Sequence, residues 1–228
     1  MKRVLAALLA ALLLTSCSGG DKPDDKSDDS PADVLAAAKK LLDETSGVSI
    51  SLTTPKLPDG VTGVTKAVGL ATHQPAFEGS IDVPISGIPA TVKVVAVNGK
   101  VFAQIPFTSG YSEVDPADFN APDPAALMNT EGGISSWLTD ATEVTEGDQT
   151  RDGSDVLTSY DGKLAGPSVA SVIPSADAKA TFDVTFTIDD KGLLHTASVN
   201  GPFYAGKPAL TYDISVSDYG TDAEISEP

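Results

Sequence analysis

One cysteine and its neighbours are the part of this sequence most suited to covalent chemistry. Cys17 is the only cysteine among the 228 residues, so the chain cannot form an internal disulfide. It follows Leu14, Thr15 and Ser16, and this order resembles a bacterial lipobox, in which the signal is cut before the cysteine and the cysteine is acylated. The pattern predicts cleavage before Cys17 and its lipidation; an ordinary signal with an incidental cysteine is the alternative.

The residues on either side of Cys17 are typical of an exported, tethered protein. Lys2 and Arg3 precede an unbroken apolar run at residues 4–14, which is short for a membrane-spanning helix. Residues 18–30 offer no apolar side chain for burial in a core and include several acidic residues, which predicts a flexible tether. We therefore expect an exported protein that is lipid-anchored to the outer face of the cytoplasmic membrane, with a signal peptide at 1–16, the lipidated cysteine and tether at 17–30, and one domain at 31–228.

The charge of the chain excludes one class of partner. The formal net charge is −17 at pH 7, and loss of Lys2 and Arg3 with the signal makes the remainder more acidic. Neutralising nucleic acid phosphates requires clustered Lys and Arg, so nucleic acid is not expected as a partner. Charge does not favour an anionic leaflet either, so membrane attachment must be hydrophobic, through acyl chains on Cys17.

Residue types that carry catalysis or bind metals are sparse. His73 and His195 are the only histidines, and the sequence has no HxxxH or HExxH spacing. Zinc sites need clustered His and Cys ligands, and no GxSxG nucleophile elbow is present. We expect no metal, no cofactor and no catalytic residue, with a hydrolase of unrecognised site as a minor alternative.

Hydrophobic periodicity predicts an α+β domain. Ser30, Pro31 and Asp33 are typical of a helix start, and Gly47 is expected to stop that helix. Its predicted apolar stripe is Val34, Ala37, Ala38, Leu41 and Leu42. Strands are predicted at 48–53, within 61–73, and at 77–85, 90–97, 100–105, 141–149, 156–164, 182–188, 193–199 and 210–216. Helical turns are predicted at 114–119, 123–128, 133–138 and 166–173. Short turns between strands imply one antiparallel sheet, curled and partly covered by helices.

The order of several motifs resembles the actinobacterial LppX/LprA/LprF/LprG lipoproteins. Besides the lipobox and the tether, the resemblance rests on residues 97–103, 123–128, 133–138, 160–164 and 216–220. It implies a half-barrel of antiparallel strands with helices on its concave face, enclosing a large apolar cavity. It also implies a non-enzymatic protein that binds acylated lipids or glycolipids and carries them across the cell envelope, with a membrane transporter as an expected partner.

Strand parity identifies the side chains that would line such a cavity, because alternate residues of a strand face the same side of a sheet. The residues expected to line it are Ile81, Val83, Ile85, Val92, Val94, Val101, Ala103, Ile105, Leu127, Ile134, Trp137, Leu138, Phe182, Val184, Phe186, Tyr212 and Ile214. The same residues would serve a closed core packed against the helices. A non-enzymatic envelope scaffold or sensor with a filled core is therefore the alternative function.

Overall fold

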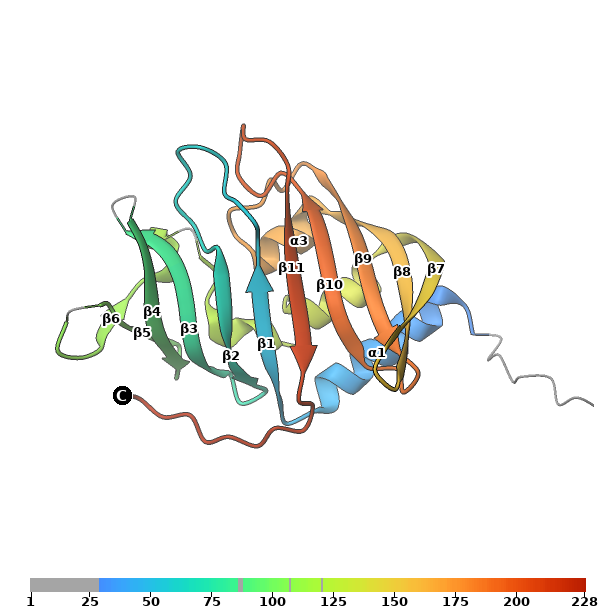
Figure 1. The fold of residues 1–228 in the computed structure, drawn as a ribbon, viewed down its shortest axis with the longest axis horizontal. Helices are drawn as coiled ribbons and strands as arrows, with labels where there is room; N and C mark the ends of the chain where they lie inside the picture. The colour runs from blue at the N-terminus through green and yellow to red at the C-terminus, as the bar shows by residue number, and fades with distance from the viewer. Residues whose placement is uncertain (1–28, 86–87, 107, 120) are drawn as a thin grey trace, which may run out of the picture.

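Eleven antiparallel strands form one sheet, and the helices lie against one of its two faces (Figure 1). The computed structural model describes residues 29–85, 88–106, 108–119 and 121–228. The expected signal peptide, Cys17 and nearly all of the tether lie outside these ranges, so those predictions stay predictions. The fold described below is that of the expected domain.

The elements follow the predicted order closely. In chain order they are α1 (Pro31–Glu44), β1 (Gly47–Thr53), β2 (Lys66–Thr72), β3 (Ala76–Ile85), β4 (Ile88–Val97), β5 (Lys100–Gln104), β6 (Ser112–Val114), the 3-10 helices η1 (Pro116–Phe119), η2 (Pro124–Met128) and η3 (Ile134–Ser136), α2 (Trp137–Asp140), β7 (Thr142–Asp152), β8 (Asp155–Ala165), α3 (Gly166–Val172), β9 (Thr181–Asp189), β10 (Leu194–Gly201) and β11 (Leu210–Ser217). The ten predicted strands are confirmed. The short β6 was not predicted, because three residues are too few to show a period.

The first and last strands meet in the middle of the sheet. The strand order is β6-β5-β4-β3-β2-β1-β11-β10-β9-β8-β7. Ser49 of β1 pairs with Leu70 of β2 on one side and with Ser217 of β11 on the other. Each half of the sheet is otherwise built from neighbours in sequence, so the β1–β11 pair joins two meanders.

The sheet is not strongly curled, which corrects the expected half-barrel (Figure 1). Bulges are what bend a sheet sharply. The register shifts lie in the β7–β8 and β9–β10 pairs, whereas β1 to β5 pair without interruption. The edges β6 and β7 do not pair with each other. The sheet is therefore open, and the helices cover one face of it.

Helix α1 begins as the sequence predicts. The Asp33 amide donates to the Ser30 hydroxyl over 3.3 Å, and the Ser30 amide donates to the Asp33 carboxylate over 3.3 Å, which together make a capping box. The predicted end is wrong: the helix ends at Glu44, Thr45 is already extended, and Gly47 starts β1. The cap is local in sequence, and the end is set by the strand that follows.

The apolar stripe of α1 differs in phase from the predicted one. The fully buried side chains are Leu35, Ala38 and Leu42, whereas Leu41 is 37% exposed. Lys39 lies between the buried positions, and its ammonium donates to the Thr130 carbonyl over 2.8 Å. Contacts with η3 and α2 set this rotation of the helix, and they are not visible in the sequence of α1 alone.

Large, fully buried side chains fill the core beneath β8 to β10. Trp137 of α2 is 0% exposed, and its indole N–H donates to the Ser168 carbonyl of α3 over 2.9 Å. The Phe203 ring makes edge-to-face contacts with Phe182 and Tyr212, at centroid distances of 5.1 Å and 4.8 Å. This half of the sheet is covered by α1, α2 and α3 together.

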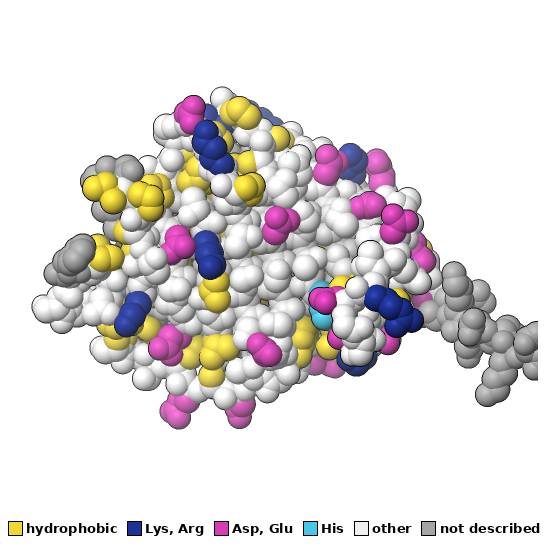
Figure 2. Space-filling model, viewed as in Figure 1, with side chains coloured by type: hydrophobic (Ala, Val, Ile, Leu, Met, Phe, Trp, Pro, Cys, Tyr) yellow, Lys and Arg dark blue, Asp and Glu magenta, His cyan; other side chains and the backbone are white. Residues whose placement is uncertain are grey.

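The opposite face of the sheet is exposed and largely polar. Figure 2 views this face, and its surface is mostly neutral polar side chains and backbone with scattered charges. A small apolar cluster on it joins Ala76, Val95 and Val97 with Ile225 of the C-terminal segment. Asn98 also donates to the Glu227 carboxylate over 3.1 Å, so the last residues lie against the β4–β5 turn.

Candidate functional site

Two adjoining apolar pockets lie between the sheet and the segments that cover it. They lie over β1 to β5 and β11, whereas α1, α2 and α3 cover the other half of the sheet. The first has a volume of about 50 Å³ and lies over β1, β2, β3 and β11. The second has a volume of about 70 Å³ and lies over β3, β4 and β5. Both are lined by Val64, Ile81, Ala121, Pro122 and Pro124. These shared residues make the two pockets neighbouring parts of one site.

A pair of glycines shapes the floor of the first pocket. Gly69 of β2 lies opposite Gly79 of β3. A Cβ atom on Gly69 would lie 2.6 Å from the Phe77 ring, and one on Gly79 would lie 2.7 Å from it. The missing side chains let the ring of Phe77 lie flat on the sheet instead of rising into the pocket. The two glycines of β2 and β3 thus leave space above the Phe77 ring.

The cover over the pockets is short and rich in proline. The second pocket is roofed by Val114, Pro116 and Phe119 together with the shared residues 121, 122 and 124. The Asp123 carboxylate accepts a hydrogen bond of 2.9 Å from the Ala125 amide and caps η2. Short 3-10 turns carry few large side chains toward the sheet, so they leave room that a long helix would fill.

Among the described residues that line the pockets, Tyr204 and Tyr212 alone carry polar side-chain atoms. The Tyr212 hydroxyl donates to the Val64 carbonyl over 2.9 Å and lies 3.0 Å from the Tyr204 hydroxyl. Since Tyr212 has one proton to donate, Tyr204 must be the donor to Tyr212. Burial raises the pKa of Tyr212 above the ordinary value, and the hydrogen bond with Tyr204 adds to the rise. Both hydroxyls are satisfied, so the site stays apolar.

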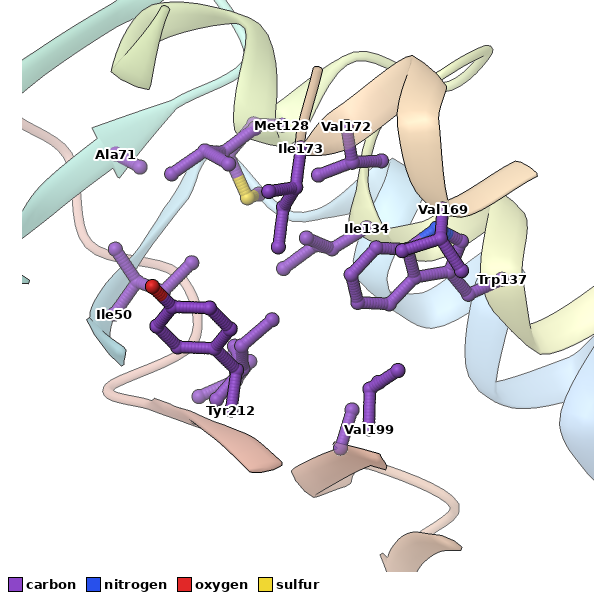
Figure 3. Close-up of a cluster of buried hydrophobic side chains, with 14 of the residues drawn as sticks. Ile50, Ala71, Met128, Ile134, Trp137, Val169, Val172, Ile173, Val199 and Tyr212 are labelled. Atoms are coloured by element: carbon purple, nitrogen blue, oxygen red, sulfur yellow. The ribbon is translucent and has the colours of Figure 1, made fainter. Parts of the chain in front are cut away.

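Figure 3 shows how the helical segments face the sheet beside the first pocket. Met128, Ile134 and Ile173 point from the covering segments toward Ile50 and Tyr212 on the central strands. Ile50, Ile134, Ile173 and Tyr212 line the pocket, whereas Met128 is buried beside it. Ile50 of β1 and Tyr212 of β11 therefore contribute to the floor of the pocket, and one wall includes Ile134 of η3 and Ile173, which follows α3.

The structure places most of the predicted cavity residues around these pockets. Those that line at least one pocket are Ile81, Val83, Val92, Val94, Val101, Ala103, Ile105, Leu127, Ile134, Tyr212 and Ile214. Those that line neither are Trp137, Leu138, Phe182, Val184 and Phe186, which are at most 2% exposed within the packed core. Ile85 is the last residue of β3, and the position of its side chain lies outside what the structure describes.

Several lining residues were not predicted from the sequence. Val64 lies in the loop between β1 and β2, Tyr204 lies in the loop between β10 and β11, and Ile173 follows α3. Tyr204 lies in a segment without a helical or strand period. Val64 and Ile173 fall within the predicted strand region 61–73 and the predicted helical turn 166–173, but they lie outside β2 and α3, so the predicted period did not assign them a face. Leu52 could have been assigned a face by parity, because it alternates with the half-exposed Ser51 and Thr53 on β1.

The site carries no arrangement suited to metal chemistry. Within the described residues, no three His, Cys, Asp or Glu side chains are grouped so that they could hold a metal ion. His195 pairs instead with the buried Asp189 over 3.2 Å, and neither residue lines the two pockets. No helix in the described part of the chain is both long and apolar enough to cross a membrane.

Comparison with known proteins identifies the family. Residues 30–225 match the family model described as LppX_LprAFG lipoprotein. The chain belongs to this family. Membership confirms the resemblance seen in the sequence and implies an exported, anchored lipoprotein. Among curated proteins, none matches this member of the family by sequence.

Two solved structures share the LppX_LprAFG fold. LprF from Mycobacterium bovis superposes with a TM-score of 0.69 at 13% identity, over 87% of this chain and 96% of LprF. The lipoprotein LppX from Mycobacterium tuberculosis superposes with a TM-score of 0.63 at 14% identity, over 88% of this chain and 100% of LppX. At such low identity the likeness shows the fold alone.

Proposed function

We propose that this protein is a membrane-anchored carrier that binds the acyl chains of a lipid or glycolipid in the two adjoining pockets and moves it across the cell envelope. The observation that carries the proposal is the apolar lining of the pockets, in which Tyr204 and Tyr212, hydrogen-bonded to each other, are the only polar side chains among the described residues. The two tyrosine hydroxyls are engaged in hydrogen bonds, and the other described lining residues are apolar, which supports a non-enzymatic role.

The energetics of lipid transfer explain why such a site is useful. Burying one methylene contributes about 0.8 kcal/mol, so a 16-carbon chain represents roughly 12 kcal/mol of gross transfer energy. Escape of a lipid with two or three such chains into water is therefore extremely slow. A dry pocket that accepts any alkyl group lowers this barrier without chemical selection along the chain.

The present pockets accept only part of such a chain. Volumes of about 50 and 70 Å³ exceed the space that a water molecule needs, but each pocket is small beside a complete lipid. Short η2 covers β2, β3 and β4, whereas the other half of the sheet is held by three helices. Loading of a long chain therefore requires η2 to separate from the sheet.

Native mass spectrometry of the mature chain after mild purification tests the proposal. We expect masses corresponding to bound lipid, and we expect the delipidated protein to take up diacyl or triacyl lipid again. A correctly folded, delipidated protein that never takes up these lipids would refute the proposal. The packed core beneath β8 to β10 would then favour the envelope scaffold or sensor.

The anchor belongs to the same proposal. Acylation of Cys17 would hold the domain on the outer face of the cytoplasmic membrane, where a membrane transporter is the proposed partner. The intact mass of the mature protein should show acyl groups on Cys17, and Cys17→Ala should move the protein from the membrane fraction to the soluble fraction. A mature protein that begins before residue 17 would contradict the lipobox assignment.

A further inference from the structure

Four exposed or partly exposed apolar side chains lie at one end of the sheet, and they include Ile88, the most exposed large hydrophobic side chain in the described part of the chain. Ile88 is 70% exposed and Ile105 is 37% exposed. Pro89 is also exposed and Pro84 is partly exposed. We call these four residues the apolar tip. Figure 2 shows hydrophobic atoms gathered at this end, beside the ends of the β3–β4 and β5–β6 connections.

The apolar tip continues into the second pocket. Ile105 is at once exposed and part of the pocket lining, and Val83, which precedes Pro84, also lines it. Val83 pairs with Ala90 across the β3–β4 hairpin, so Ile88 and Pro89 lie only one or two positions beyond the lined part of the sheet. An apolar surface therefore runs from solvent into the pocket.

The charges of the molecule also distinguish this end. The tip residues are uncharged, and the neighbouring loops at 54–65 and 202–209 carry Lys56 and Lys207 against Asp59. Lys207 donates to the Asp59 carbonyl over 2.8 Å, and Lys56 lies 3.4 Å from the Asp59 carboxylate. At the other end of the sheet, the segment after β11 carries acidic residues and no lysine or arginine. The two lysines thus offset the acidic residues Asp59 and Asp82 beside the tip, which limits the repulsion of this end by an anionic bilayer.

We propose that the apolar tip is a membrane-docking surface that inserts into the bilayer and places the mouth of the second pocket against the acyl chains. This inference rests on the proposed carrier function, and it names the lipid bilayer as the direct partner of the site. An acyl chain then passes from bilayer to pocket without crossing water. Residues 17–30 reach at most about 45 Å when fully extended, which lets an anchored domain turn this end toward the membrane.

A tryptophan placed at the tip tests the docking directly. Ile88→Trp is compared with Val68→Trp, because Val68 is 41% exposed on β2 and faces the polar side of the sheet, away from the pockets. The natural Trp137 is 0% exposed and gives the same background in both variants. Each mature chain is mixed with phosphatidylcholine–phosphatidylglycerol vesicles that carry bromine on the acyl chains. We expect quenching of Trp at position 88 and none at position 68.

A second variant measures how much the tip contributes. Ile88→Ser should slow transfer of a fluorescent diacyl lipid between vesicles about tenfold, since a buried isoleucine side chain is worth that factor or more. Val68→Ser should leave the rate unchanged. Uptake of a short, water-soluble fluorescent lipid without vesicles should be equal in all variants, because it needs the pocket and not the tip.

Three results would each overturn the docking surface. Equal quenching at positions 88 and 68 would show that the tip does not enter the bilayer, and an unchanged transfer rate in Ile88→Ser would show that it does not matter for transfer. A shift of Trp emission at position 88 with protein concentration alone would show that the tip pairs two copies of the chain. If the soluble lipid still binds in these cases, only the docking surface fails; if it does not bind, the carrier function fails as well.

Discussion

Ile81 is the residue at which a single substitution should affect the whole site. It lies on β3 between Ala67 of β2 and Val92 of β4, and it lines both pockets. An indole at this position would project into the space where the two pockets meet. Because Ile81 is only partly buried, the larger ring can be accommodated at the expense of the pockets without breaking the core. We therefore expect Ile81→Trp to fold and to bind acyl chains more weakly.

The size of the effect follows from the volume that the ring occupies. The pockets measure about 50 and 70 Å³, so an indole at their junction displaces several methylenes of a bound chain. Each excluded methylene costs about 0.8 kcal/mol, so exclusion of three weakens binding by about 2.4 kcal/mol, or about fiftyfold. Titration of the delipidated protein with a fluorescent fatty acid measures the dissociation constant.

The matched control is Val68→Trp, which adds the same ring to the opposite face of the neighbouring strand. It should bind the fatty acid as the unmodified protein does. Thermal unfolding of both variants shows whether the fold is retained. If folded Ile81→Trp binds the fatty acid as tightly as the control, the reasoning that places acyl chains in these pockets is wrong.

Three further predictions concern residues that stabilise the fold. Tyr212→Phe leaves the Val64 carbonyl and the Tyr204 hydroxyl without their shared partner, so it should cost about 1–3 kcal/mol and lower Tm by several degrees, more than Tyr204→Phe does. Because burial raises the pKa of Tyr212 above 10.0, its contribution to stability is complete below pH 10 and declines above it. Alkaline denaturation should therefore be shallower in Tyr212→Phe, and equal slopes would contradict the burial argument. Ser30→Ala removes the side-chain acceptor for the Asp33 amide and should cost about 0.5–2 kcal/mol in urea unfolding, without changing lipid binding.

Local features of this fold were predictable because neighbouring residues determine them. The capping box of α1 needs only Ser30 and Asp33, and the hairpin at Asn98 needs only the turn residues between two alternating strands. Parity likewise placed Ile81 and Val92 on the same side of the sheet, since a strand has two faces and one of them must be buried.

Features that depend on distant contacts were not predictable in this way. The rotation of α1 is set by η3 and α2, so the helix sequence alone identified Ala38 and Leu42 but included the exposed Leu41 and left out Leu35. Parity also cannot distinguish a pocket wall from a filled core: Phe182 and Val92 both face the helices, but Phe182 lies under α3 and Phe203 whereas Val92 lies under short turns. Tyr204 was missed because its loop has no period, although its hydroxyl is one of the two polar groups at the site.

The pairing of β1 with β11 has a consequence for how this protein acquires its structure. Ser49 cannot meet Ser217 until nearly the whole polypeptide has emerged on the far side of the membrane. Until then, each meander exposes an unpaired edge, and formation of such a long-range contact is slow. Export in an unfolded state and maturation at the membrane surface are thus compatible with this topology, and any truncation that removes β11 would leave two half-sheets prone to aggregation.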